Sequence, residues 1–322
     1  MVKKFFVGVD IGGTKMAAAL VSPSGRIITR EKIPTSPRTT TAAIFENVVS
    51  LIQDVLHDNQ ITAKNLGGIG VGIPGIVDID QSKILAAPNI NLAGLSISQR
   101  LAKIFHTKVA AGNDVNLGLL GEQWLGAAKN IDHVIGLFPG TGIGGAIIIN
   151  GQLILGNQGA AAELGHMIME INGPKCTCGN EGCLEALASR WAIERDIRAA
   201  IKKGKKTILA KKINSDKPIK SRLINEALKA RDPLVTKLIT KASLVLGQAC
   251  VSLAHIFNPQ AIVFGGGVIE ACGEFMLPII RQTAYADPFF KKLKRCTIVE
   301  SKLKDDAVIL GAVALIISRN NQ

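Results

Sequence analysis

The chain has 322 residues, of which 47% are hydrophobic and 4% aromatic, with 33 glycines and a net charge of +13. This length exceeds that of a typical single core, so we expect two domains, and the composition is typical of an aliphatic α/β core with many tight turns. Much of the excess charge lies in lysines between residues 202 and 220, without interleaved aromatic residues or the spacing of a DNA-reading motif; this favours a solvated basic face and no nucleic-acid partner.

The N-terminal region predicts neither a signal peptide nor a membrane anchor. Two lysines precede a short apolar stretch that ends at Asp10, and no apolar run reaches the roughly 18 residues that a membrane span needs. Cys250, Cys272 and Cys296 are far apart in sequence and are expected to be ordinary buried thiols. A cytoplasmic location, which is reducing, fits free cysteines.

The first strand is predicted to end in a glycine turn. The apolar run Phe5 to Val9 leads into Asp10-Ile11-Gly12-Gly13-Thr14-Lys15, and a second run, Met16 to Val21, follows. Backbone N–H groups in such a turn can hold a phosphate, and Asp10 could bind Mg²⁺ directly or through water. The alternative is a plain β-turn with an N-terminal aspartate. The chain has no Walker A loop.

A second carboxylate follows another predicted strand. The strand Val109 to Ala111 ends in Gly112-Asn113-Asp114, and a helix is predicted from there to about Ala128. Asp114 therefore lies between a strand and a helix N-terminus, where α/β folds place ligands. The alternative is that Asp114 only caps the helix.

A second glycine turn follows the predicted strand His133 to Phe138. Its sequence, Gly140-Thr141-Gly142-Ile143-Gly144-Gly145, matches the dinucleotide-binding pattern G-x-G-x-x-G, but that site needs a helix next. Two short strands around an Asn150-Gly151 hairpin turn follow instead. The segment repeats the opening pattern after about 130 residues, which predicts two units that grip a nucleotide phosphate chain.

The segment from Glu163 to Glu185 is rich in metal ligands. His166, Cys176, Cys178 and Cys183 supply one imidazole and three thiolates, a closed set suited to structural zinc. The alternative is three core thiols beside an unrelated histidine. Nearby glycines allow the tight backbone that would bring the four ligands together.

The remaining chain is predicted to be mainly helical. Helices are expected over Leu184 to about Lys203, Leu234 to Phe257 and Val308 to Ile317. Between the last two, the strand Ala261 to Phe264 leads into Gly265, Gly266 and Gly267. These glycines permit either the approach of an adenine or ribose ring to the backbone or tight strand–helix packing.

The chain carries a two-part signature: Gly165-His166, and later the segment C-x-C-G-x-x-G-C-x-E from Cys176 to Glu185. This signature resembles that of the ROK family (repressors, open reading frames and sugar kinases), and of its glucokinase branch in particular. The resemblance extends from Val7 to about Ile317. It implies the duplicated α/β fold of actin-like ATPases and sugar kinases, which is ribonuclease H-like, with two domains around a central cleft. The expected domains are 1–112 with a returning helix at about 305–322, and 113–304.

The same resemblance implies roles for individual residues. Asp114 would be the general base, and the sugar would be bound by Asn113, Asp114, Glu163, His166 and Glu185. Zinc would be structural on His166, Cys176, Cys178 and Cys183, and Asp10 would hold Mg²⁺. The nucleotide would contact Asp10, Gly12, Gly13, Thr14, Lys15, Thr141, Gly142, Gly265, Gly266 and Gly267.

The implied activity is ATP-dependent phosphorylation of a hexose primary hydroxyl, with glucose favoured. N-acetylglucosamine, N-acetylmannosamine and fructose are the alternative acceptors. A sugar-responsive repressor is a weaker alternative, because such relatives carry a helix-turn-helix ahead of the first glycine turn and only nine residues precede Asp10 here. The resemblance also implies a dimer or tetramer of identical chains and domain closure on the sugar.

Overall fold

The computed structural model describes residues 4–36, 39–62, 64–78, 83–87, 90–214, 217–292 and 296–320. The chain forms two compact units. Unit 1 comprises Met1–Asp132, Ile147–Ala162 and Asp305–Gln322, and unit 2 comprises His133–Ala146 and Glu163–Lys304. The C-terminal segment thus returns to the first unit. The domain boundaries expected from the sequence stay a prediction.

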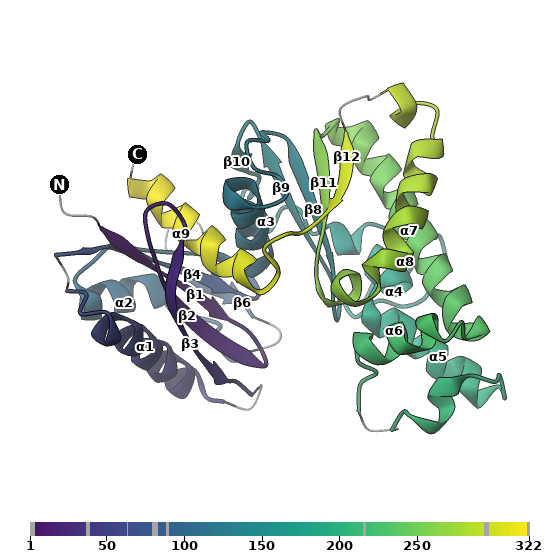
Figure 1. Cartoon of the computed structure of the whole chain (residues 1–322), viewed down its shortest axis with the longest axis horizontal. Helices are drawn as coiled ribbons and strands as arrows, with labels where there is room; N and C mark the ends of the chain where they lie inside the picture. The colour runs from purple at the N-terminus through teal and green to yellow at the C-terminus, as the bar shows by residue number, and fades with distance from the viewer. Residues whose placement is uncertain are drawn as a thin grey trace. The chain divides into compact units, whose positions relative to one another are not determined.

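Unit 1 contains a five-stranded sheet in the order β3-β2-β1-β4-β7 (Figure 1). The first three strands pair antiparallel as a meander, and then β4 runs parallel to β1 and β7 parallel to β4. The strands are β1 (Phe5–Ile11), β2 (Lys15–Val21), β3 (Ile27–Pro34), β4 (Leu66–Ile73) and β7 (Val109–Asn113), with a small hairpin of β5 (Ile76–Val77) and β6 (Ile84–Ala86).

Helices pack against this sheet through apolar residues that recur at helical spacing. In α1 (Thr41–Asp58), the residues Ile44, Val48, Leu51, Ile52 and Val55 are buried, as the sequence pattern predicts. They join strand residues such as Val7, Val9, Ile69 and Val71 in one aliphatic core. The other helices of unit 1 are α2 (Ile97–Phe105), α3 (Asp114–Leu125) and α9 (Ala307–Asn320).

Helix α9 packs directly against the backbone of α3 and of the sheet. A Cβ atom added to Gly311 would overlap the carbonyl oxygen of Leu117, and one added to Gly121 would overlap that of Ala307. A Cβ at Gly70 of β4 would overlap Ala312 in the same way. These glycines are therefore required by close approach of two backbones. They fix the C-terminal helix beside the strands that end at Asp10 and Asn113.

A second five-stranded sheet has the order β10-β9-β8-β11-β12. Its strands β8, β11 and β12 and the start of β9 belong to unit 2, whereas the end of β9 and β10 fall within Ile147–Ala162 of unit 1. Strand for strand, this order repeats β3-β2-β1-β4-β7 of the first sheet, with β8, β11 and β12 parallel like β1, β4 and β7. The predicted internal repeat is thereby confirmed at the level of topology. The strands are β8 (Val134–Pro139), β9 (Ile143–Ile149), β10 (Gln152–Leu153), β11 (Ala261–Phe264) and β12 (Thr297–Glu300).

The helix expected over Leu184 to about Lys203 is divided in two at Ser189. This residue has an extended backbone, is fully buried, and its hydroxyl accepts a hydrogen bond from the Ala192 N–H at 3.1 Å. Serine thus caps a new helix instead of continuing the old one.

The helices of unit 2 are α4 (Leu184–Ala188), α5 (Arg190–Lys202), α6 (Ser221–Lys229), α7 (Pro233–Phe257) and α8 (Gly267–Ala286). Short 3-10 turns occupy Leu164–His166, Ile208–Lys211 and Phe290–Lys292 in unit 2, and Lys304–Asp306 spans the point where the chain returns to unit 1.

Among the described residues, α7 alone is long and apolar enough to cross a membrane by length and composition. Ten of its residues are buried, including Ile239, Leu246 and Leu253, and it packs against α4, α5 and α8. A core helix of a soluble protein passes the same test, and burial against three helices accounts for this apolar surface.

Replacing Gly311 by alanine tests the backbone contact between α3 and α9. Alanine in a helix interior normally gains up to about 1 kcal/mol over glycine. Here we expect a loss of more than about 2 kcal/mol in the free energy of unfolding, because the added methyl group forces α9 away from Leu117. Gly118→Ala in α3 is the matched control, since its Cβ would meet only a Val308 methyl at 4.0 Å. Urea titration of both variants measures the difference, and equal stability would contradict the close contact.

Candidate functional site

The first glycine turn joins β1 to β2 in unit 1 and is closed by its own backbone. The Gly12 N–H donates to the Lys15 carbonyl at 2.9 Å, and a Cβ on Gly12 would lie 2.9 Å from that same oxygen. The Lys15 ammonium lies 2.8 Å from Asp305, in an exposed pair at the start of the returning segment. Arg30 of β3 pairs with the adjacent Asp306. The opening turn is thus tied to the C-terminal segment.

Two carboxylates of unit 1, those of Asp10 and Asp114, interact electrostatically. Burial, which is the largest cause, and the negative charges of Asp114 and Asp305 together raise the pKa of the Asp10 carboxyl group to about 7, against the lowering effects of Lys15 and Arg30. A cation beside Asp10 would stabilise its buried negative charge, which a second carboxylate repels. Carboxylate oxygens are the ligands that Mg²⁺ prefers.

Asn113, rather than Asp114, is the capping residue of α3. Its Oδ1 accepts hydrogen bonds from the N–H groups of Val115 at 2.9 Å and Asn116 at 3.0 Å, and its Nδ2 donates to the Gly75 carbonyl at 2.9 Å. Asp114 is the first helical residue, with Oδ1 2.9 Å from the Val115 N–H. The capping function that could have explained Asp114 is therefore carried by its neighbour, and the partly buried Asp114 stands at a helix N-terminus.

The second glycine turn joins β8 to β9 in unit 2. The Gly140 N–H donates to the Gly142 carbonyl at 2.8 Å, and the chain continues directly into a strand at Ile143. The dinucleotide-binding interpretation is excluded, as expected, because no helix follows the glycines. Thr141 at the tip of the turn is exposed, so its hydroxyl is available to a ligand.

Glu185 of α4 holds this turn in place. Its Oε2 accepts a hydrogen bond from the Ile143 N–H at 2.9 Å, and its Oε1 accepts one from the Thr177 hydroxyl at 3.0 Å. Any side chain at position 142 would overlap the same carboxylate. Glu185 therefore connects the glycine turn to the cysteine-rich segment. Glu163, the other acidic residue expected at the sugar, is exposed just before the 3-10 turn that carries His166.

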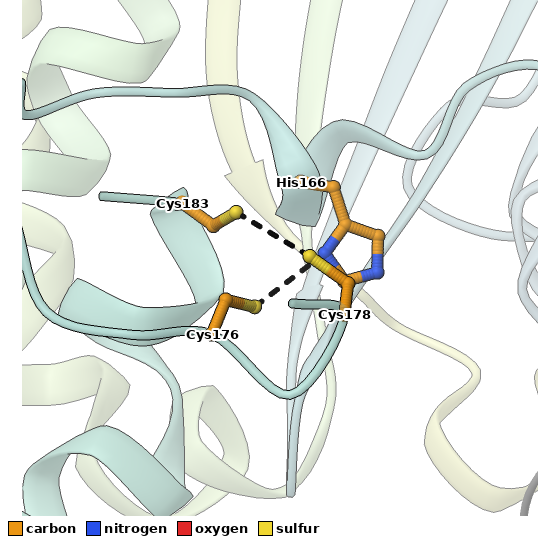
Figure 2. Close-up of side chains that lie close together, drawn as sticks. All are labelled: His166, Cys176, Cys178 and Cys183. Atoms are coloured by element: carbon orange, nitrogen blue, oxygen red, sulfur yellow. Dashed lines mark hydrogen bonds between the residues drawn. The ribbon is translucent and has the colours of Figure 1, made fainter. Parts of the chain in front are cut away.

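The four predicted zinc ligands converge, as Figure 2 shows. The His166 ring nitrogens and the sulfurs of the three cysteines each provide a ligand atom within 4.8 Å of the others. Cys176 Sγ lies 3.7 Å from His166 Nδ1, and Cys178 Sγ lies 3.7 Å from Cys183 Sγ. A zinc tetrahedron with Zn–S bonds of about 2.3 Å has ligand–ligand edges of about 3.8 Å. The observed separations therefore suit a tetrahedral ion with thiolate and imidazole ligands.

Backbone contacts shape the loop around these ligands. The Cys176 N–H donates to the Asn180 carbonyl at 2.8 Å and the Gly182 N–H to the Pro174 carbonyl at 2.9 Å. Gly182 has φ +74°, and any side chain there would overlap the Glu170 backbone. Burial, which is the largest cause, and the neighbouring thiols together raise the pKa of the Cys183 thiol to about 12, whereas a backbone hydrogen bond from Asn180 lowers the pKa of Cys178. The raised pKa favours the protonated thiol at Cys183, and a coordinated metal ion would stabilise its thiolate form.

The sequence left two interpretations open for the three glycines before α8, namely tight strand–helix packing and space for a ligand. The structure favours packing for two of these glycines and space for the third. A Cβ on Gly265 would lie 2.8 Å from the Phe138 ring, and Gly266, with φ +80°, would place one 2.8 Å from the Pro139 carbonyl. These two glycines are explained by close packing of the strand ends. Gly267 is exposed, and a Cβ there would meet no atom within 4 Å. Space for a ligand is therefore left at Gly267 alone.

Sequence reasoning missed Arg190, whose side chain and backbone both contact the second glycine turn. Its only sequence signal was the neighbouring Ser189, a capping residue within an otherwise helical pattern.

The lysine-rich segment is a solvated face, as expected, since all of its lysines are exposed: Lys202, Lys203, Lys205, Lys206, Lys211, Lys212, Lys217 and Lys220. Part of it borders an open pocket of about 810 Å³ in unit 2, together with Arg231.

Known proteins resemble this chain over its whole length. A glucokinase of Thermotoga maritima is 33% identical over 322 residues, which cover 99% of each protein. A xylose repressor of Caldicellulosiruptor bescii is 30% identical over 97% of this chain and 78% of its own length. The crystal structure of a glucokinase of Streptomyces griseus, in complex with glucose and AMPPNP, superposes with a TM-score of 0.78 at 30% identity, covering 97% of this chain and 98% of that one.

The sequence pattern of one protein family matches residues 6–319 of this chain. The matched range includes both glycine turns, both strand-end carboxylates and the four-ligand cluster. The fold of its members is the duplicated fold of actin-like ATPases and sugar kinases, in agreement with the repeated strand order of the two sheets. The chain belongs to the ROK family.

Proposed function

We propose that this protein transfers a phosphoryl group from ATP·Mg²⁺ to the primary hydroxyl of a hexose, and that the hexose is glucose. The observation that carries the proposal is the duplicated strand–glycine turn–strand unit, combined in unit 1 with Asp10 near the end of β1 and Asp114 directly after β7, two strands of one sheet that are separated by β4. The likeness to glucokinases supports both the reaction and the sugar.

In this proposal the two turns hold the nucleotide phosphates. Gly12, Gly13, Thr14 and Lys15 act in unit 1, and Thr141 and Gly142 act in unit 2. Gly267 lies at an open backbone position where a nucleoside could approach, while Gly265 and Gly266 shape the strand end beside it. Asp10 holds Mg²⁺, which neutralises phosphate charge. Phosphoryl transfer depends mainly on such positioning and charge stabilisation.

Asp114 is the proposed general base. It accepts the proton of the sugar hydroxyl as the hydroxyl oxygen attacks the γ-phosphorus, so that the new O–P bond forms while the bond to the ADP oxygen breaks. The position of Asp114 supports this role, because it is the first residue of α3 directly after β7, at the carboxyl end of a parallel strand where α/β folds bind ligands. Asn113 also holds the Gly75 carbonyl and so fixes the loop beside Asp114.

The sugar is proposed to contact Asn113, Asp114, Glu163, His166 and Glu185. Carboxylates suit this task because a hexose presents several O–H donors. Glu185 already accepts two hydrogen bonds from the protein, but a carboxylate has about four acceptor sites, so it can accept a sugar hydroxyl as well. Zinc on His166, Cys176, Cys178 and Cys183 would be structural, because four protein ligands leave no open position for catalysis.

Other acceptors and a regulatory role are the alternatives. N-acetylglucosamine, N-acetylmannosamine or fructose would use the same turns and carboxylates with a differently shaped sugar site. A sugar-responsive repressor is favoured by one specific observation, the 30% identity to a xylose repressor. Catalytic turnover separates the repressor from every kinase.

The first test is ADP release from Mg²⁺·ATP with a panel of hexoses and 2-acetamido hexoses. We expect turnover with glucose to exceed that with the other sugars. Asp114→Asn should lower kcat by about 10³-fold or more while nucleotide affinity changes little, because general-base assistance and proton acceptance are lost. Asp54→Asn, an exposed carboxylate of α1, is the matched control.

Each outcome of the panel has a definite meaning. Preference for an acetamido sugar or fructose replaces glucose and leaves the other assignments in place. Turnover of Asp114→Asn within tenfold of the wild type removes Asp114 from the role of base. If the folded protein turns over none of the sugars, the kinase proposal fails and the repressor alternative takes its place.

Removal of one zinc ligand should affect metal content, stability and sugar affinity together. We expect Cys176→Ala to lose the ion and to raise the KM for the sugar several-fold, because the loop that carries Thr177 and presses on Glu185 loosens. Cys272→Ala removes a buried thiol outside the cluster and should retain one zinc per chain. Metal analysis, thermal unfolding and kinetics provide the readouts. Full activity of Cys176→Ala without metal would exclude a structural zinc.

Asp10→Asn should increase stability and abolish activity. The pKa of Asp10 is raised from its ordinary 3.8 to about 7 in the folded state, so the wild type binds this proton more tightly when folded. Its stability therefore falls as pH rises from about 4 to 7, by at most roughly 4 kcal/mol for this group, while Asn is unaffected. Urea unfolding at pH 5 and pH 8 in EDTA measures the difference. An equal gap between variant and wild type at both pH values would contradict the buried, repelled carboxylate.

A further inference from the structure

Arg190 contacts the second glycine turn through its backbone N–H and its guanidinium group. Its backbone N–H donates to the Gly140 carbonyl at 3.0 Å, and its Nη2 donates to the Thr141 hydroxyl oxygen at 2.8 Å. The next residue, Trp191, donates its N–H to the Thr141 carbonyl at 3.2 Å. The first residues of α5 thus hold both the backbone and the side chain of the turn.

The contact from Nη2 decides what the Thr141 hydroxyl can do. A hydroxyl group has one proton to donate and accepts through its oxygen. The guanidinium donates to one of the two acceptor lone pairs of the oxygen, and among the described residues no acceptor takes the hydroxyl proton. Thr141 is exposed, so this proton is left for a ligand that offers an acceptor. A charged donor on the oxygen also polarises the O–H bond and makes it a stronger donor.

The guanidinium is itself held by the fold. Its Nη1 donates to the Ile219 carbonyl at 3.2 Å and lies 3.5 Å from Glu194, and the Arg190 side chain is only 17% exposed. The other arginines of α5 have different partners: Arg195 lies over the Trp191 ring and pairs with Asp196, and Arg198 binds the Asn214 and Lys217 carbonyls. Arg190 is therefore the one arginine of α5 that reaches the turn.

We propose that Arg190 is a positioning residue for the nucleotide phosphates: it fixes the Thr141 hydroxyl as a hydrogen-bond donor directed at a phosphate oxygen and adds positive charge behind it. The inference rests on the proposed function only in that the second turn binds phosphate. Ionised phosphate oxygens accept and never donate, so they match a hydroxyl whose proton is left to donate. A ligand that presents only a hydrogen-bond donor would have to share the hydroxyl oxygen with the guanidinium.

The test is a double-mutant cycle in the full-length protein. Thr141→Val removes the hydroxyl and keeps the shape, and Arg190→Met removes the guanidinium and keeps most of the apolar stem. Each single variant should raise the KM for Mg²⁺·ATP about tenfold or more and leave the KM for the sugar within about twofold. In the Thr141→Val background, Arg190→Met should cost less than about threefold more, because the two residues act as one unit.

A second readout separates phosphate recognition from general damage. The inhibition constant of ADP should rise about tenfold in Arg190→Met while that of adenosine stays within about twofold, because adenosine has no phosphate for Thr141 to contact. Arg190→Lys keeps the charge and should fall between wild type and Arg190→Met. Arg195→Met is the matched control on the same helix and should leave both constants unchanged.

The outcomes separate this proposal from the one before it. If Thr141→Val raises the KM for Mg²⁺·ATP and Arg190→Met does not, or if their effects multiply in the double variant, the role of Arg190 is overturned and the phosphate turn stands. If neither variant affects Mg²⁺·ATP or ADP in an active enzyme, the second turn does not bind phosphate and both ideas fail. Equal weakening of ADP and adenosine would show a merely structural role.

Discussion

The hydrogen bonds of the Glu185 carboxylate are the constraint on which the site of unit 2 depends. One oxygen accepts the Ile143 N–H of the second glycine turn, and the other accepts the Thr177 hydroxyl between two cysteines of the ligand cluster. Cys176 Sγ also lies 3.8 Å from the same carboxylate. Because Gly142 leaves no room for a side chain beside Glu185, the turn and the cysteine-rich loop cannot shift independently. Order in the cysteine-rich loop is thereby transmitted to the turn.

The division of one predicted helix into α4 and α5 extends this arrangement to the other side of the turn. Ser189 ends α4, and the first two N–H groups of α5, which no helix can satisfy internally, bond to the carbonyls of Gly140 and Thr141. Trp191 in the same turn of helix packs against Cys176 and Cys183. The four-ligand cluster, the glycine turn and the start of α5 therefore share one small core, although Gly140 and Trp191 are 51 positions apart in sequence.

Local sequence signals were sufficient to predict the strands, the two glycine turns, the repeat and the ligand cluster, because each depends on neighbouring residue types. They failed where a distant partner decides. Asn113 and Asp114 are both good capping residues by sequence. In the structure Asn113 caps α3, and its side-chain amide is held by the distant Gly75 carbonyl. Ala186, Leu187 and Ala188 favour a continuous helix, so the break at Ser189 was hidden. Arg190 could not be found, since its hydroxyl partner is 49 residues away. Phe138 and Pro139 explain two glycines that the sequence left open.

The two halves share a strand order but differ in the charge that their turns favour. In unit 1, burial and a second carboxylate make negative charge on Asp10 costly, which a cation would relieve. In unit 2, a guanidinium donates to an exposed hydroxyl whose proton is left for a ligand, and an anion would accept that proton. The same strand–turn–strand unit thus has different surroundings in the two halves, and by the proposed function the first favours a metal ion and the second a phosphate. A nucleotide triphosphate that carries its own Mg²⁺ meets both demands at once, whereas a bare sugar meets neither, which is the physical reason to assign these turns to the phosphoryl donor.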